Sequence, residues 1–235
     1  MTTKTRTGVT SAERPDVGGA MPLAPPRLRR PSRVLDWALP SAVFALLALV
    51  NARRAFERGP VAHTVFAVGG TLLWIGLFAV VQKRPAPARR ERAPLAVAAA
   101  LAATFVTIPI GAAAPTDAVG RLLPAIVLLV AGCGFSLWAI ATLGSRFGVL
   151  ADARGLVMRG PYRIVRHPLY LGELVNLGGL VVGAQRWQLP LAAWLGLLVV
   201  QLVRSVYEER VLEAAFVGYG PYRTEVRRRI LPGVI

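Results

Sequence analysis

Six long apolar blocks constrain this 235-residue chain more than any other feature of its sequence. They fall near residues 34–50, 61–81, 94–114, 122–143, 169–184 and 188–206. A helix needs roughly 20 apolar residues to cross the hydrocarbon core of a bilayer, and four blocks approach or exceed that length. The last two blocks are separated only by Gln185-Arg-Trp-Gln188, which predicts a tight helical hairpin. We therefore expect an all-α integral membrane protein with about six transmembrane helices.

The basic residues give this architecture an orientation. Lys and Arg divide 23 to 5 between the two alternating sets of loops and ends. Positive charge accumulates on the cytoplasmic side of membrane proteins, so we expect both termini, the 144–168 loop and the tail to be cytoplasmic. The net charge of +16 is not evidence for nucleic-acid binding, because these residues sit between apolar blocks rather than on a soluble domain. They are placed to meet anionic lipid head groups.

Three segments follow from this pattern. Residues 1–33 are rich in Pro, Arg, Thr and Gly, have no apolar period and read as a disordered basic N-terminal arm rather than a cleaved signal peptide. Residues 34–143 contain four anchoring helices. Residues 144–235 contain a polar loop, the hairpin and the tail. The Ala-, Arg- and Gly-rich composition indicates a bacterial source, so we expect the inner (plasma) membrane.

The chain contains few residues that could bind a metal ion or form a disulfide. Cys133 is the only cysteine, so no intrachain disulfide forms, and we interpret it as a small residue for helix packing. His63 and His167 are the only histidines, so the chain offers too few ligands for a His/Cys metal cage. His63 lies at the outer start of the second block and is interpreted as an interface residue. We expect no metal site.

Polar groups concentrate where the fifth block begins. Pro168 suits the first turn of a helix, which puts Arg166 and His167 at its entrance. A helix N-terminus offers unpaired N–H groups and a positive dipole, a seat for a carboxylate. Glu173 follows Tyr170 by about one turn, and a carboxyl group facing lipid would be costly, so we expect it to face a polar cavity.

The fifth and sixth helices each have a distinctive face. Gly172, Asn176, Gly179 and Gly183 form a stripe that permits close approach of a neighbouring helix or a ligand. Gln201, Arg204 and Glu208 share one face at the inner end of the sixth helix. Taken alone, this second face reads better as an interface collar with an Arg204–Glu208 pair. The short turn, however, brings it beside His167, which favours a shared site.

These residues carry a resemblance to a known family. The run Gly160-Pro-Tyr-Arg-Ile-Val-Arg-His-Pro-Leu-Tyr-Leu-Gly172 resembles the Arg-His-Pro-x-Tyr-x-Gly signature of the isoprenylcysteine carboxyl methyltransferases, which are related to phospholipid methyltransferases. The tail is similar as well, with the ordered set Glu208, Glu209, Leu212, Phe216, Tyr219, Tyr222, Leu231 and Pro232. The resemblance covers about residues 143–232.

What the resemblance implies is S-adenosyl-L-methionine bound at the inner membrane face. The residues it assigns to the cofactor are Arg154, Gly155, Leu156, Val157, Tyr162, His167, Pro168, Leu169, Tyr170 and Glu208. Arg204 and Glu208 are the catalytic candidates, and Arg204 with Glu173 would meet the methyl acceptor. The implied substrate is a lipid or lipidated molecule from the bilayer, such as an isoprenylcysteine carboxylate.

Two chemistries and two other functions stay open. A carboxylate acceptor needs no general base and could be oriented by Arg204, whereas an amine must lose a proton, to Glu173 or Glu209. Sterol-type reductases that use NADPH resemble this family in their last helices, so a membrane reductase is an alternative. A non-catalytic protein that binds lipid head groups is another.

Overall fold

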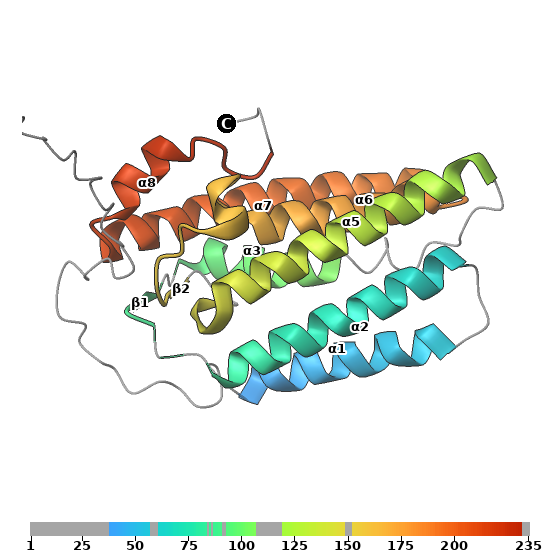
Figure 1. The fold of residues 1–235 in the computed structure, drawn as a ribbon, viewed down its shortest axis with the longest axis horizontal. Helices are drawn as coiled ribbons and strands as arrows, with labels where there is room; N and C mark the ends of the chain where they lie inside the picture. The colour runs from blue at the N-terminus through green and yellow to red at the C-terminus, as the bar shows by residue number, and fades with distance from the viewer. Residues whose placement is uncertain are drawn as a thin grey trace, which may run out of the picture.

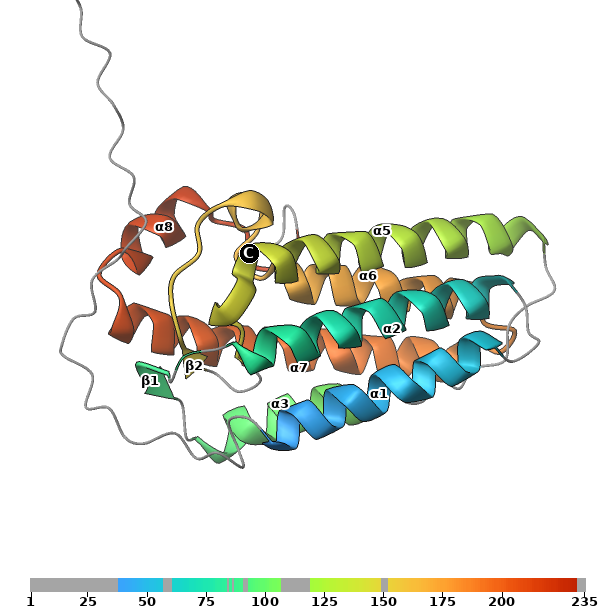
Figure 2. The ribbon, with the colours of Figure 1, turned by 60° about the horizontal axis from the view of Figure 1, so that its bottom comes forward.

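The computed structural model describes residues 38–56, 61–83, 85, 87–90, 93–106, 119–148 and 152–231, which are mostly helical. Within these residues, six longer helices lie side by side in alternating directions (Figures 1 and 2). They are α1 (Leu39–Phe56), α2 (Val61–Gln82), α3 (Pro94–Val106), α5 (Val119–Leu143), α6 (Pro168–Gly183) and α7 (Gln188–Ala215). Each corresponds to one predicted apolar block. The predicted hairpin is present, with α6 and α7 joined through residues 184–187.

Two stretches are long and apolar enough to cross a membrane, Gly120–Arg146 and Gln188–Ala215. Only 28% of the apolar window of the first and 22% of the second is buried inside the molecule, unlike the core helices of a soluble protein. Shorter apolar helices cover Pro40–Arg53, Ala67–Gln82 and Pro168–Gly183. The helical membrane class therefore agrees with the structure, while the count of six spans stays a prediction. The N-terminal arm, and residues 107–114 of the third block, lie outside the described residues.

The glycine stripe of α6 packs against α5. A Cβ on Gly172 would lie 2.3 Å from Ser136 Oγ, and one on Gly179 would lie 2.8 Å from the Ala125 carbonyl oxygen. Asn176, between them, donates a hydrogen bond from Nδ2 to the Leu129 carbonyl at 2.9 Å. The stripe was predicted to permit close approach of either a neighbouring helix or a ligand, and the structure shows the helix α5 there. Gly132 of α5 completes the contact, since its Cβ would lie 2.3 Å from the Asn176 amide nitrogen.

The other helices pack around this pair. Cys133 of α5 contacts the Gly69 carbonyl of α2 through its thiol at 3.4 Å, as expected of a packing residue. Phe44 of α1 stacks on Trp74 of α2, with ring centroids 5.6 Å apart. On the other side, α3 packs against α7, and the Trp194 indole of α7 donates to the Leu174 carbonyl of α6 at 2.8 Å.

Several short elements at one end of the bundle were not predicted. The two-residue strands β1 (Arg89–Arg90) and β2 (Asp152–Ala153) pair antiparallel and join the loop after α2 to the loop after α5. A 3-10 turn, Gly160–Arg163, precedes α6, and the helix α8 (Tyr219–Glu225) follows α7. Gly160 begins its turn with a φ of 58°, in the left-handed region that favours glycine.

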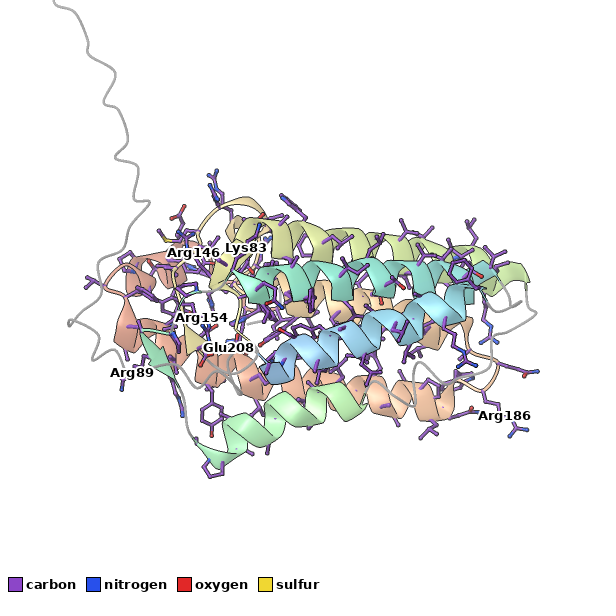
Figure 3. The ribbon with its side chains drawn as sticks, turned by 90° about the horizontal axis from the view of Figure 1, so that it is seen from below. Lys83, Arg89, Arg146, Arg154, Arg186 and Glu208 are labelled. Carbon is purple, nitrogen blue, oxygen red and sulfur yellow. The ribbon has the colours of Figure 1, made fainter. Side chains whose placement is uncertain are left out.

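The two ends of the bundle differ in charge. Lys83, Arg89, Arg146 and Arg154 lie at the end that carries β1, β2 and α8, whereas Arg186 lies at the opposite end (Figure 3). The loops that the charge count assigned to the cytoplasmic set are therefore gathered at one end of the molecule.

Two glycines of α5 provide a matched test of the α5–α6 contact. A Cβ at Gly132 would collide with the backbone of α6, whereas one at Gly134 would meet nothing within 4 Å. We expect Gly132→Ala to lower the free energy of unfolding by about 1–3 kcal/mol, the usual range for overpacking. Gly134→Ala should leave it unchanged or slightly higher, because alanine favours helix. Thermal unfolding of both proteins in detergent measures this, and equal melting temperatures would show that the contact is not tight.

Candidate functional site

The α6–α7 hairpin lines up ionisable and polar side chains along its seam. We call this set the polar ladder: His167, Tyr170 and Glu173 at the α6 side, and Glu208, Arg204 and Gln201 on α7. Successive members of the set are three or four residues apart along each chain segment, so they repeat on one face. Because the two helices are antiparallel, His167 pairs with Glu208 near the entrance of α6, and Glu173 pairs with Gln201 at the deepest point.

The distances show a connected set. His167 Nδ1 lies 3.6 Å from Glu208 Oε2, and the Tyr170 hydroxyl donates to Glu208 Oε1. The Arg204 guanidinium lies 3.7 Å from Glu208 Oε1 and 5.0 Å from the centre of the Tyr170 ring. That ring stacks on His167 with a centroid separation of 5.3 Å. His167 and Glu208, predicted from the two halves of the hairpin to border a common environment, are thus in direct contact.

The neighbouring carboxylate, Glu209, points to a different set of partners. Its carboxylate oxygens accept hydrogen bonds from Arg166 Nε at 2.9 Å, from His167 Nε2 at 3.2 Å and from the Arg229 guanidinium at 3.1 Å. Its side chain is 5% exposed and that of Arg166 is 6% exposed. We call Glu209, Arg166 and Arg229 the tail clamp. With its oxygens occupied by these donors, Glu209 is a poor candidate for the general base that an amine acceptor would need.

The C-terminal tail, which includes Arg228 and Arg229, binds part of the predicted carboxylate-binding site at the start of α6. The backbone N–H groups of Arg166 and His167 donate to the carbonyls of Arg228 and Arg229, each at 2.9 Å. Pro168 has no N–H to offer. The Tyr222 hydroxyl donates to the Tyr162 carbonyl at 2.7 Å and fastens the tail to the turn before α6. The backbone N–H groups just before α6 therefore already have partners within the chain, which was not predicted from the sequence.

The loop predicted to hold a nucleoside lies at the same end. Arg154 donates through Nη1 to the Pro85 carbonyl and through Nη2 to Asp152 Oδ2 at 2.9 Å. Leu156 packs against an apolar cluster that contains Tyr219, whose hydroxyl is buried without a hydrogen-bond partner among the described residues. A buried hydroxyl without a partner is a group that a bound ligand or a water molecule could satisfy.

The remaining predicted residues lie close by but differ in surroundings. Gly155 follows Arg154 in the loop, Val157 and Tyr162 are buried, and Pro168 is the first residue of α6. Leu169 packs instead against the apolar cluster that includes Phe147 of the segment after α5. The structure thus brings most of the predicted set to one end and turns Leu169 away from the polar ladder.

His167 is held between two carboxylates. Both ring nitrogens face carboxylate oxygens, which only accept hydrogen bonds when ionised, so the arrangement suits the doubly protonated ring. Burial, the largest single influence, lowers the pKa of His167, but the hydrogen bonds and charges of Glu208 and Glu209 together raise it above its usual value. The geometry and the raised pKa both favour the protonated ring, which links Glu208 to Glu209.

The fold and this cluster define a helical membrane protein whose charged side chains meet at one end of a two-helix hairpin. Residues 121–218 match the family model described as phospholipid methyltransferase. The match confirms the predicted resemblance, because the isoprenylcysteine carboxyl methyltransferases are related to that family, and it indicates a membrane methyltransferase. It spans α5, α6, α7 and the loops between them. A search of curated proteins finds no match to the chain.

The tail clamp generates a first prediction for this site. Glu209→Gln removes the negative charge that Arg166 and Arg229 share, and breaking a buried ion pair from one side costs about 3 kcal/mol. We expect a lower melting temperature and faster trypsin cleavage of the tail. Glu213→Gln is the control, since Glu213 and its partner Arg223 are each about half exposed and such pairs contribute little. If both variants behave like wild type, the clamp does not hold the tail.

The raised pKa of His167 generates a second prediction. A raised folded-state pKa contributes stability that is complete below the unfolded value of about 6.5 and is lost as pH rises through the folded value. We expect the stability difference between wild type and His167→Gln to shrink as the pH rises above neutrality. Melting temperatures across a pH series measure it, and parallel profiles for the two proteins would contradict the assignment of a charged ring.

Proposed function

We propose that this protein is an S-adenosyl-L-methionine-dependent methyltransferase that acts on a lipid or lipidated acceptor at the cytoplasmic face of a membrane. The observation that carries the proposal is the contact of His167 and Tyr170 with Glu208 across the α6–α7 seam, together with that of Arg204 with Glu208 and with the Tyr170 ring. It supports the proposal because the residues that the family resemblance assigns to cofactor and acceptor form one connected cluster.

The donor and acceptor groups present fit the cofactor. Its ammonium group needs a carboxylate, and Glu208 lies on the polar ladder with a side chain 20% exposed. A nucleoside has an apolar face, and Leu156 of the segment Arg154–Val157 packs on an apolar cluster that also contains the Tyr219 ring. The tail already occupies the backbone N–H groups of Arg166 and His167, so these two are not available to the cofactor's carboxylate.

When bound, this cofactor supplies a methyl group on a positively charged sulfur. The residues of the chain then have three tasks. Glu208 binds the cationic end and is itself oriented by His167, Tyr170 and Arg204. Arg204 and Glu173 border the space where the acceptor is aligned, and the apolar helices exclude water from it. Alignment matters most, because displacement at a methyl carbon requires donor and acceptor to lie in line.

The membrane arrangement is part of the proposal. The basic loops that gather at one end would face the cytoplasm, in the bacterial inner membrane, and would contact anionic head groups there. The 28 residues of α7 extend about 42 Å, longer than the roughly 30 Å hydrocarbon core. The end of α7 that carries Glu208 and Glu209 would therefore project from the inner leaflet, with the site at the lipid surface.

Binding of the cofactor provides the direct test. We expect purified protein in detergent or nanodiscs to bind S-adenosyl-L-methionine saturably, and Glu208→Gln to weaken binding at least about tenfold, because a buried charge-assisted contact contributes roughly 1.5–3 kcal/mol. His167→Ala should also weaken it. Glu213→Gln, at the exposed surface, should bind normally. A folded wild-type protein that binds no cofactor would exclude the proposal, and stabilisation by NADPH instead would favour the reductase alternative.

A further inference from the structure

The deepest pair of the polar ladder contains a hydrogen-bond acceptor without a partner. Gln201 of α7 has an exposed fraction of 0%, and its Nε2 donates to Glu173 Oε2 of α6 at 2.5 Å. Its Oε1 is buried and has no hydrogen-bond partner among the described residues. Buried amide oxygens are nearly always satisfied, so an orphan of this kind points to a donor that is supplied by another molecule.

The hydrogen bond to Glu173 fixes how the Gln201 amide lies in the structure. Its nitrogen faces Glu173 Oε2, the arrangement that suits an ionised carboxylate, which accepts hydrogen bonds and cannot donate them. Reversing the amide would set its oxygen against the carboxylate oxygen. The oxygen is therefore held away from Glu173 as a fixed acceptor.

The position of this oxygen connects it with the acceptor side of the site. Gln201 lies three residues before Arg204 on α7, about 4.5 Å along the helix axis and further from the end that carries Glu208. Arg204 is engaged by Glu208 and by the Tyr170 ring. Beyond it lie the Glu173 carboxylate, on which the charge of Arg204 also acts, and Gln201 Oε1. At Oε1 itself an N–H or O–H group is the complementary partner, whereas a carboxylate oxygen could not form a hydrogen bond with it.

We propose, on the basis of the function proposed above, that Gln201 is a specificity-determining residue: its Oε1 accepts a hydrogen bond from the N–H or O–H of the methyl acceptor. The site then favours amine or hydroxyl acceptors over carboxylates. Transfer forms a bond from the acceptor nitrogen or oxygen to the methyl carbon and breaks the carbon–sulfur bond, whose electron pair stays on sulfur. The acceptor proton is released, and the Glu173 carboxylate, beside Gln201, is the group placed to take it.

The test compares three lipidic acceptors on the full-length protein in nanodiscs. They are phosphatidylethanolamine as the amine, a long-chain phenol as the hydroxyl and N-acetyl-S-farnesylcysteine as the carboxylate, each with S-adenosyl-L-methionine carrying a labelled methyl group. We expect wild type to methylate the amine or the phenol and to leave the carboxylate unmodified. The three arms distinguish the possible sources of the donor group and need no variant to fold.

Gln201→Met then tests the residue, because methionine has a similar size and neither donates nor strongly accepts a hydrogen bond. Loss of one buried hydrogen bond predicts a fall of about tenfold or more in kcat/KM for the acceptor. The Kd of the cofactor should stay within about twofold. Gln185→Met, in the exposed turn between α6 and α7, is the matched control and should leave both constants unchanged.

The remaining outcomes contradict, one by one, the proposed acceptor specificity, the role of Gln201 and the proposed function. Methylation of the carboxylate alone, or of none of the three acceptors by a protein that binds the cofactor, contradicts the proposed specificity. A Gln201→Met protein that keeps its kcat/KM shows that Oε1 meets no acceptor, and one that loses cofactor affinity instead assigns Gln201 to the cofactor. Absence of cofactor binding by wild type refutes the proposed function itself.

Discussion

The ion pairs around Glu209 tie together three segments that are far apart in the sequence. Arg166 comes from the turn before α6, Glu209 from the last part of α7, and Arg229 from the tail. Consecutive residues of a helix point about 100° apart, so a clamp on Glu209 turns Glu208 toward His167 and Tyr170. The buried Arg166, the partly buried Arg229 and the buried Glu209 stabilise each other here, and Glu208 is left to contact His167 and Tyr170. The position of the site therefore depends on Glu209, which contacts His167 and the tail but is not assigned to the cofactor or the acceptor.

The helices and their pairing could be predicted from the sequence because they rest on local patterns. Apolar blocks of bilayer length identify the helices, and a four-residue connection between the last two blocks permits only an antiparallel pair. The contact of His167 with Glu208 follows from that pairing and from residue spacing. The glycine stripe predicted a close approach, although only the structure distinguishes a helix from a ligand as its partner.

What could not be predicted depends on contacts between short and distant segments. The strands β1 and β2 contain two residues each, too few for a periodic signal. The tail pairs with Arg166 and His167 through backbone groups, which no side-chain pattern encodes. The adjacent residues Glu208 and Glu209 look alike in the sequence, and their separate roles appear only once the surrounding cations are placed. The buried oxygen of Gln201 likewise becomes informative only when its surroundings are known.

The backbone contacts between α5 and α6 have a mechanical consequence. Where Gly132 and Gly172 bring two helices to van der Waals distance, sliding or rotation of one against the other meets steep repulsion. We therefore expect α5 and α6 to move together as a single rigid unit. If a lipid acceptor enters as proposed, the bundle would have to widen between other helix pairs, of which α6–α7 and α3–α7 border the polar ladder. The smallest side chains of the bundle thus limit where it can open.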